Sequence, residues 1–219
     1  MRWDVSIQEA KKIQEKLRSS IRLERLSAPR IIAGVDVSCN RFDPILYAGI
    51  VVVSFPDLRI LETAFAKQKG TFPYVPGYLS FREIPVVLEA FKKMKTQPDV
   101  LCVDGQGVAH PRSLGIATHL GLVLDIPSVG FAKSILYGRG PEPKSEVTSF
   151  EYLLDPRTNE RIGAQVRTKS NTKPMIISPG HRVTVDDAIE LALATTRGYR
   201  VPEPTRRAHQ EVNAFRRGE

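Results

Sequence analysis

Two aspartates lie in segments that are otherwise apolar. Asp36 stands within Gly34-Val35-Asp36-Val37, and Asp104 directly follows Val100-Leu101-Cys102-Val103. A carboxylate within a buried strand is costly unless it is paired or bound to a metal ion. For each aspartate alone, a cap or a buried salt bridge is at least as good an explanation. The occurrence of both in one small protein favours a shared metal site.

A third carboxylate, Glu83, lies on the expected first turn of a helix. Three convergent carboxylates are typical ligands of a hard cation, Mg²⁺ above all. In phosphodiester hydrolysis such an ion polarises a phosphoryl oxygen and lowers the pKa of a bound water. The sequence leaves open whether one ion binds or two.

A glycine-rich turn, Gly105-Gln106-Gly107, follows Asp104, and His110 and Arg112 come shortly after it. Two glycines let the backbone approach a ligand closely, and a following helix start offers N–H donors to an anion. A lone Gly-x-Gly is usually only a tight turn. Its position behind a strand-ending aspartate makes it more informative than the motif alone. His119, on the next helix, is expected to be a hydrogen-bonded structural histidine.

The elements that would position these groups begin with a helix and three strands. Ser6 and Glu9 have the spacing of a capping box, and apolar residues then recur at helical spacing. Three runs rich in β-branched residues follow at 31–38, 47–54 and 58–65. Their short links favour antiparallel neighbours, so we expect a three-stranded meander that carries Asp36.

Alternating helices and strands fill the rest of the chain. A helix is predicted over 79–94, with Pro85 in its first turn, where the missing N–H costs little. A strand at 99–103, a helix at about 113–122 and a strand at 126–131 predict a parallel βαβ unit. The remaining predictions are an irregular insertion at 137–159, edge strands at 162–168 and 175–177, a helix at 184–196 capped by Thr184 and Asp187, and a basic helix after Pro202.

This order predicts an α/β protein with a mixed sheet. A three-stranded antiparallel meander is continued by parallel strands, and helices flank the sheet. The order matches the RNase H-like architecture. With 219 residues and 42% hydrophobic content, the chain is expected to form a single domain over residues 1–219.

The net charge of +8 predicts attraction to polyanions, because neutralised phosphates release condensed counterions. This charge does not choose between nucleic acid and an anionic membrane, although the lack of a long basic amphipathic anchor favours nucleic acid. No apolar run is long enough to span a membrane, and no signal peptide is evident. Cys39 and Cys102 follow no metal-ligand spacing and do not suggest a disulfide framework. We therefore expect a cytoplasmic monomer.

Five sequence blocks, in this order, resemble the motif series of the endonuclease V family. They are Gly34-Val35-Asp36-Val37-Ser38, then Pro73-Tyr74-Val75-Pro76-Gly77 with Phe81-Arg82-Glu83, then Asp104-Gly105-Gln106-Gly107 through His110-Pro111-Arg112, then Gly130-Phe131-Ala132-Lys133-Ser134, and finally Pro202-Glu203-Pro204-Thr205-Arg206 with Ala208-His209. The resemblance covers essentially the whole chain, from about residue 3 to residue 217.

The resemblance implies a DNA-repair endonuclease that uses Mg²⁺, with Mn²⁺ as a substitute. It would recognise a deaminated purine (deoxyinosine, with the base hypoxanthine) in DNA. It would cut one nucleotide beyond the lesion on the 3′ side and leave a 3′-hydroxyl and a 5′-phosphate. By position, Asp36, Glu83 and Asp104 would bind the metal, and His209 would complete the metal or water environment. Lys133 would lie against the phosphate at the cut, where it offsets developing charge.

The block from Pro73 to Pro76 matches the family's strand-separating wedge. Two prolines fix its backbone, so Tyr74 would enter the duplex in place of the extruded base with little loss of entropy. Without the resemblance, such a loop is more often a rigid turn with a packed ring. The predicted substrate-binding residues, wedge and base pocket together, are Pro73, Tyr74, Val75, Pro76, Gly77, Leu79, Gly105, Gly130 and His110.

Two other hypotheses stay open. An inosine-specific ribonuclease, or another RNase H-like nuclease, would keep the fold and the metal and change the substrate to RNA. A non-catalytic lesion-binding module would lose the chemistry, and the intact acidic set argues against it.

Overall fold

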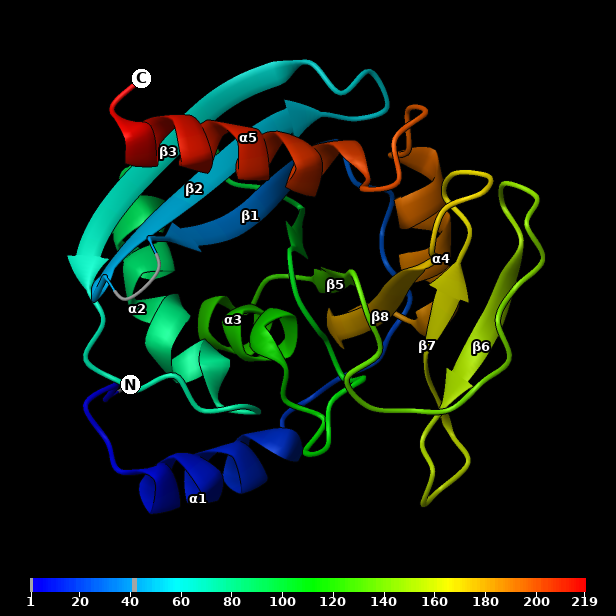
Figure 1. Ribbon diagram of the computed structural model, residues 1–219, viewed down its shortest axis with the longest axis horizontal. Helices are drawn as coiled ribbons and strands as arrows, with labels where there is room; N and C mark the ends of the chain where they lie inside the picture. Colours follow the sequence, from blue (N-terminus) through cyan, green and yellow to red (C-terminus); the bar gives the residue numbers. More distant parts are fainter. Residues whose placement is uncertain (1, 41–42) are drawn as a thin grey trace.

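The computed structural model describes residues 2–40 and 43–219 (Figure 1). Its helices are α1 (Ile7–Arg18), α2 (Leu79–Phe91), α3 (Ile116–Leu124), α4 (Val185–Ala194) and α5 (Glu203–Arg217). Its strands are β1 (Ile31–Cys39), β2 (Ile45–Ser54), β3 (Ile60–Lys69), β4 (Val100–Val103), β5 (Ser128–Ala132), β6 (Phe150–Leu154), β7 (Arg161–Val166) and β8 (Met175–His181). These strands form one sheet in the order β3-β2-β1-β4-β5-β8-β7-β6.

The sheet is mixed, as predicted. β2 pairs antiparallel with both β1 and β3, which confirms the meander. β4 pairs parallel with β1 and with β5, and α3 connects β4 to β5, which confirms the βαβ unit. β8, β7 and β6 then extend the sheet with antiparallel pairs.

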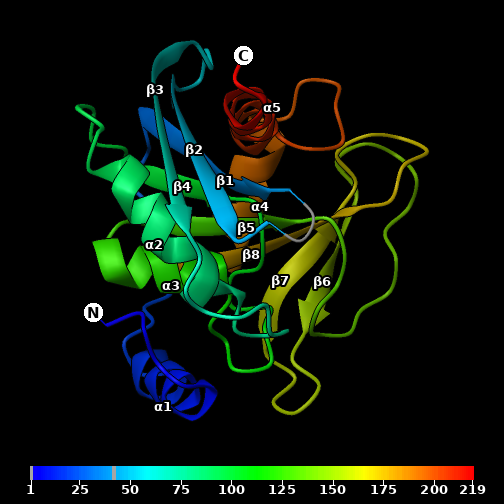
Figure 2. The same cartoon turned by 60° about the vertical axis from the view of Figure 1, so that its left-hand side comes forward.

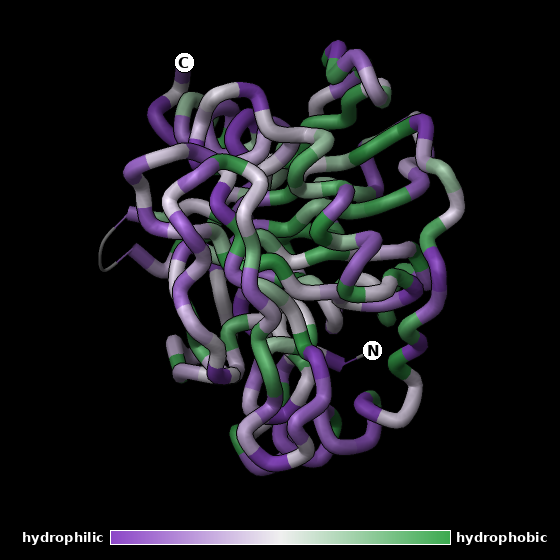
Figure 3. Tube along the Cα trace, turned by 90° about the vertical axis from the view of Figure 1, so that its right-hand side faces the viewer, coloured by the Kyte–Doolittle hydropathy of each residue, from purple (hydrophilic) through white to green (hydrophobic). Residues whose placement is uncertain are grey.

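Helices cover both faces of the sheet. Figure 2 shows α5 on one side of the meander and α2 on the other. Side chains alternate along a strand, so Ile32 belongs to the core under α4 and α5, whereas Ala33 belongs to the core under α2 and α3. In Figure 3, runs of hydrophobic residues pass through the middle of the trace, and hydrophilic residues are more frequent toward its outside. By the same alternation, Asp36 faces α5.

Two glycines let α5 lie close to the sheet. A Cβ at Gly34 would lie 1.9 Å from the backbone oxygen of Pro204, and a Cβ at Gly49 would lie 2.7 Å from Cβ of Val212. Real Cβ atoms essentially never show contacts under 3.0 Å. A side chain at either position would therefore push the helix away from the sheet. The two glycines set the height of α5 above β1 and β2, and α5 carries His209.

The predicted capping residues are confirmed. The Ser6 side chain accepts a hydrogen bond from the backbone of Glu9, and the Glu9 side chain accepts one from the backbone of Ser6. The Thr184 side chain accepts from the backbone N–H of Asp187 at the start of α4. His119 is fully buried, with Nδ1 2.9 Å from the Ser80 hydroxyl, in agreement with a structural role.

α2 begins at Leu79, as predicted, but the placement of Glu83 and Pro85 in its first turn was wrong. Glu83 is its fifth residue and Pro85 its seventh, both beyond the first turn. Tyr78, the residue that precedes the helix, makes no side-chain capping hydrogen bond. The sequence therefore contains no polar cap that marks where α2 begins.

The predictions for the segment after Tyr137 also need correction. The segment 137–159 is not irregular throughout, because β6 forms within it and pairs with β7. β7 and β8 are internal strands rather than edge strands, and β6 forms the edge. β8 is also longer than predicted, because it continues through Pro179 to His181; the register between β5 and β8 shifts there and accommodates the missing N–H of the proline. No helix among the described residues is long and apolar enough to cross a membrane.

Candidate active site

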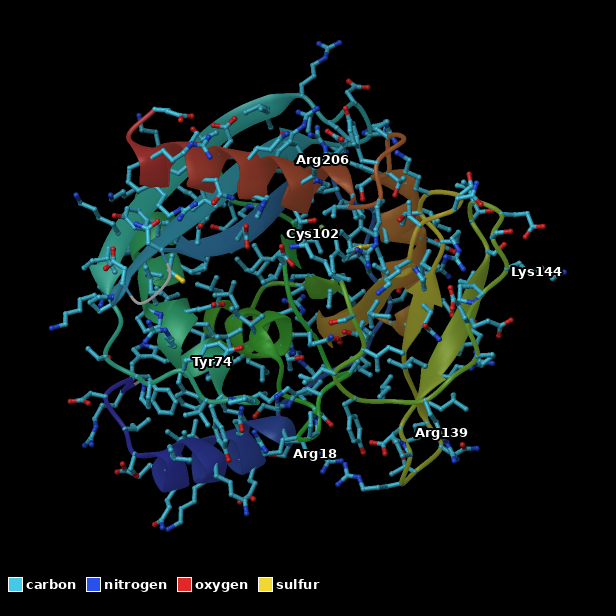
Figure 4. All side chains as sticks on the ribbon, viewed as in Figure 1. Arg18, Tyr74, Cys102, Arg139, Lys144 and Arg206 are labelled. Atoms are coloured by element: carbon cyan, nitrogen blue, oxygen red, sulfur yellow. The ribbon has the colours of Figure 1, made fainter. Side chains whose placement is uncertain are left out.

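Asp36 and Asp104 lie side by side because β1 and β4 are parallel neighbours. Val35 pairs with Val103, and the backbone N–H of Asp104 donates to the carbonyl of Val35 at 3.0 Å. The strand alternation turns both carboxylates toward α5. Cys102, two residues before Asp104, marks this part of the sheet beneath α5 in Figure 4. Asp36 is only 8% exposed.

α5 brings an imidazole to the two carboxylates. Nδ1 of His209 lies 2.7 Å from Oδ2 of Asp36. One possible ligand atom from each of Asp36, Asp104 and His209 lies within 4.8 Å of the others, and we call these three residues the metal group. Residues from the first strand and from a C-terminal helix thus meet at one point.

Asn213 supports the imidazole and was not predicted. It lies one turn after His209, with Nδ2 3.2 Å from Nε2 of His209. Its Oδ1 accepts a hydrogen bond from the Ser38 hydroxyl at 2.8 Å. The imidazole is therefore held between Asp36 and Asn213. The spacing of four residues on one helix was the available sequence signal.

Glu83 and Lys133 flank the metal group. Glu83 is not part of it, yet burial and the charges of Asp36 and Asp104 raise the pKa of Glu83 to about 8. Lys133 directly follows β5, and its ammonium forms an ion pair with the Asp104 carboxylate. Arg200, another residue that was not predicted, donates from Nη2 to the carbonyl of Lys133 at 2.6 Å.

The electrostatics of the metal group suit a cation. Burial, followed by the charge of Asp104, raises the pKa of Asp36 to about 6, although His209 and Lys133 act in the opposite direction. The raised pKa values of Asp36 and Glu83 mean that neighbouring side chains compensate the negative charge incompletely. A divalent cation would supply the missing positive charge. Two carboxylates with an imidazole are donors that such ions accept, so the residues fit a metal ion.

A pocket of about 300 Å³ opens beside Asp104 and Lys133. Seven of the predicted substrate-binding residues line it: Tyr74, Val75, Pro76, Gly77, Leu79, Gly105 and His110. The sequence reasoning missed Gln106, Leu114, Ile116 and Leu136, which also line it. Burial raises the cost of a charge on His110 and lowers its pKa to about 4, so this wall of the pocket is neutral at pH 7.

Two residues expected at the substrate site lie outside this lining. Pro73 precedes it along the loop. Gly130 is buried behind the glycine-rich turn, and a Cβ there would lie 2.4 Å from the backbone nitrogen of Gly107. The structure therefore places Gly130 as a close-packing residue that seats the turn.

The side chain of Tyr74 is not packed against the protein. It is 73% exposed. The alternative of a rigid turn with a packed ring therefore does not describe this loop. An exposed ring at the mouth of a pocket is available to another molecule.

Comparison with known proteins identifies the family. The sequence profile described as endonuclease V matches residues 12–210. The chain belongs to the endonuclease V family. Endonuclease V of Protochlamydia amoebophila is 45% identical over 217 residues, which are 97% of this chain and 91% of that protein.

Solved structures of endonuclease V also resemble the whole chain. The enzyme from Streptomyces avermitilis has a TM-score of 0.92 and 36% identity, covering 99% of this chain and 95% of that one. Endonuclease V of Ciona intestinalis, solved with a DNA that contains an inosine followed by a ribo-adenosine, has a TM-score of 0.85 and 26% identity, covering 97% and 98%. As a member of this family, the chain is a phosphodiester hydrolase.

The fold relationship extends beyond endonuclease V. Argonaute of A. aeolicus has a TM-score of 0.52 at 12% identity, covering 90% of this chain and 30% of that one. This likeness concerns the fold alone. It confirms the RNase H-like architecture that the order of elements predicted.

Proposed function

We propose that the chain is an Mg²⁺-dependent endonuclease V that recognises a deaminated purine in DNA. It cuts one nucleotide beyond the lesion on the 3′ side and leaves a 3′-hydroxyl and a 5′-phosphate. The observation that carries the proposal is the pocket of about 300 Å³ directly beside Asp104 and Lys133. This arrangement suits an extruded base in the pocket and its backbone phosphate at the metal group. The inosine-containing DNA bound to the Ciona relative supports the same ligand class.

Asp36 and Asp104 would hold the cation, with His209 as a third donor and Glu83 beside them. When bound, the ion supplies Lewis-acid polarisation of a phosphoryl oxygen and a water of lowered pKa. The side chain of Lys133 is 46% exposed, so its ammonium is accessible to a phosphate as well as to Asp104. There it offsets the negative charge that grows on the phosphoryl oxygens.

The loop and the pocket would select the base. Hypoxanthine has a carbonyl where adenine has an exocyclic amine, so backbone N–H groups can donate to hypoxanthine at a position where adenine offers no acceptor. Gly77 (φ 81°) and Gly105 (φ 151°) provide backbone in the lining without a side chain in the way. Tyr74 would fill the space that the extruded base leaves in the duplex.

Cleavage of paired duplexes tests the proposal. The two duplexes differ in a single inosine, and each is incubated with Mg²⁺ and then with EDTA. We expect one cut in the inosine strand, one nucleotide beyond the lesion, and none with EDTA. Equal cutting of both duplexes, or cutting in EDTA, contradicts the proposal.

Substitutions test the assigned roles. Asp36→Asn and Asp104→Asn should each lower cleavage by at least about 100-fold while duplex binding remains. Asp57→Asn, at an exposed aspartate of the β2–β3 turn, is the matched control and should cut normally. Full cleavage by either metal-group variant contradicts its role.

Inosine-containing RNA is a second candidate substrate. The DNA in the Ciona complex has a ribo-adenosine directly after the inosine. Inosine-DNA and inosine-RNA of one sequence, cut side by side, distinguish the two substrates. A single domain over residues 1–219 and a monomeric state stay predictions.

A further inference from the structure

Side chains hold the loop that carries Tyr74 at both of its ends. At the start, Nη1 of Arg82 donates to the carbonyl of Phe72 at 2.8 Å. At the end, the carbonyl of Gly77 accepts two hydrogen bonds, from Nε2 of Gln14 at 3.0 Å and from Nη2 of Arg112 at 2.7 Å. The exposed ring of Tyr74 therefore stands on a loop whose ends are fixed to the rest of the protein.

Gln14 connects α1 to this loop. It is fully buried, although the rest of α1 offers mostly exposed charged residues. Its Oε1 accepts a hydrogen bond from Nε of Arg112, and its Nε2 donates to Gly77. The amide orientation is fixed because a guanidinium has only donors. Removing this amide leaves a partly buried donor of Arg112 without its acceptor, which is costly.

Arg112 fits this place closely. Its guanidinium carbon lies 4.2 Å from the centroid of the Tyr78 ring. A Cβ at Gly77 would lie 2.7 Å from Nη2 of Arg112, so the guanidinium occupies the space that a larger residue would need. Gln14, Arg112 and Gly77 thus form one contact set, which we call the loop clamp.

The apolar side of α1 supports the same loop. Ala10 of α1 forms a buried cluster with Phe72 and Phe81, and Ile13, Val75 and Tyr78 pack against it. α1 therefore contacts both the loop and the start of α2. The two buried residues of α1, Ala10 and Gln14, both face this loop region.

We propose that Gln14 is a positioning residue for strand separation. It fixes the Gly77 end of the loop, directly and through Arg112, and so presents Tyr74 to a duplex in one position. The inference rests on the proposed function, because it requires Tyr74 to enter a base stack. A fixed loop loses less conformational entropy on insertion than a mobile one. Loosening the clamp should therefore lower kcat/KM for duplex substrates. It should leave kcat/KM for single-stranded substrates nearly unchanged, because no partner strand is displaced there.

The test compares duplex and single-stranded inosine-DNA. Gln14→Met keeps the approximate shape and removes both hydrogen bonds. Its ratio of kcat/KM for duplex over single strand should fall by about three- to tenfold. Gln14→Glu keeps an acceptor for Arg112, so its duplex-over-single-strand ratio should fall less. This second variant also provides a test if Gln14→Met folds poorly. Gln8→Met, at an exposed position of α1, is the matched control and should keep the ratio. An equal loss on both substrates indicates a merely structural role and overturns the proposal.

Two further measurements decide whether Gln14 acts through the loop. In a Tyr74→Ala background, Gln14→Met should leave the ratio unchanged, because the two substitutions then affect one step. In the free protein, Gln14→Met should speed hydrogen exchange at the Tyr78 amide, which donates to the carbonyl of Val75 at 3.0 Å. The proposal is overturned if Gln14→Met leaves hydrogen exchange at the Tyr78 amide unchanged. It is also overturned if Gln14→Met lowers the kcat/KM ratio by the same factor in the Tyr74→Ala background as in the wild type. A wild-type protein that cuts no inosine substrate would instead refute the proposed function, while the exchange experiment still tests the clamp.

Discussion

Replacing Gly34 by alanine should disable the metal group without changing any of its residues. The new Cβ would lie 1.9 Å from the backbone oxygen of Pro204, and the obstacle is backbone rather than a flexible side-chain end. Ordinary contact begins at 3.4 Å. The start of α5 must therefore move away from β1 by about 1.5 Å, because a close-packed core offers no empty space.

The expected size of the effect follows from that displacement. Overpacking of this kind costs about 1–3 kcal/mol, and a backbone obstacle places Gly34→Ala near the upper end. For a chain of this length, the loss lowers Tm by about 6–12 °C. The same movement stretches the 2.7 Å contact between His209 and Asp36 beyond hydrogen-bond range. A misplacement of about 1 Å at a reacting group can lower the rate roughly 100-fold.

Thermal unfolding and inosine-duplex cleavage measure the two effects. Gly198→Ala is the control, because nothing lies within 4 Å of the Cβ it would add. Its positive φ should cost only about 1 kcal/mol, and cleavage should stay normal. A Gly34→Ala variant with the Tm and the cleavage rate of the wild type would refute this reasoning. Such a result would mean that the absence of a side chain at Gly34 does not set the distance between α5 and β1.

Two other substitutions probe the packing and the pH response. Gly49→Ala should lower Tm, and adding Val212→Ala should not restore the loss, because the nearest obstacle is Cβ of Val212, which alanine keeps; a double variant that melts above Gly49→Ala contradicts this. Burial lowers the pKa of His119 to about 3, whereas in the unfolded chain it is about 6.5. As pH falls through this window the unfolded chain binds the proton first, so the stability that neutral His119 contributes is present above pH 6.5 and is lost toward pH 3. His119→Asn should therefore show a flatter pH dependence of the free energy of unfolding in urea between pH 7 and 4.5; parallel curves for the two proteins would contradict this.

The carboxylates could be predicted from sequence because a charged residue in a buried strand violates the local composition. Asp36 and Asp104 stand out for that reason, but the parallel pairing of β1 with β4, which brings them together, was not predicted. His209 could be placed only through the resemblance. Its position depends on how α5 sits above Gly34, and no local pattern encodes a contact between such distant segments.

Other features had no local signal at all. α2 begins without a capping side chain, and no local signal corrected the placement of Glu83 and Pro85 in its first turn. Gln14 has the appearance of an ordinary polar residue on a basic helix, and its hydrogen-bond partners Arg112 and Gly77 lie far away in the chain. Polar residues that serve distant partners are indistinguishable in sequence from residues that face water.

The metal group also has an order of assembly during synthesis. Asp36 and His209 are separated by 173 positions in the chain. At roughly 5–20 residues per second, synthesis adds His209 about 9–35 s after Asp36. Throughout that interval the nascent chain has the carboxylate of β1 but not the imidazole of α5. With the roles proposed above for these residues, a growing polypeptide therefore lacks a complete metal group until α5 has been synthesised and has docked on β1 and β2.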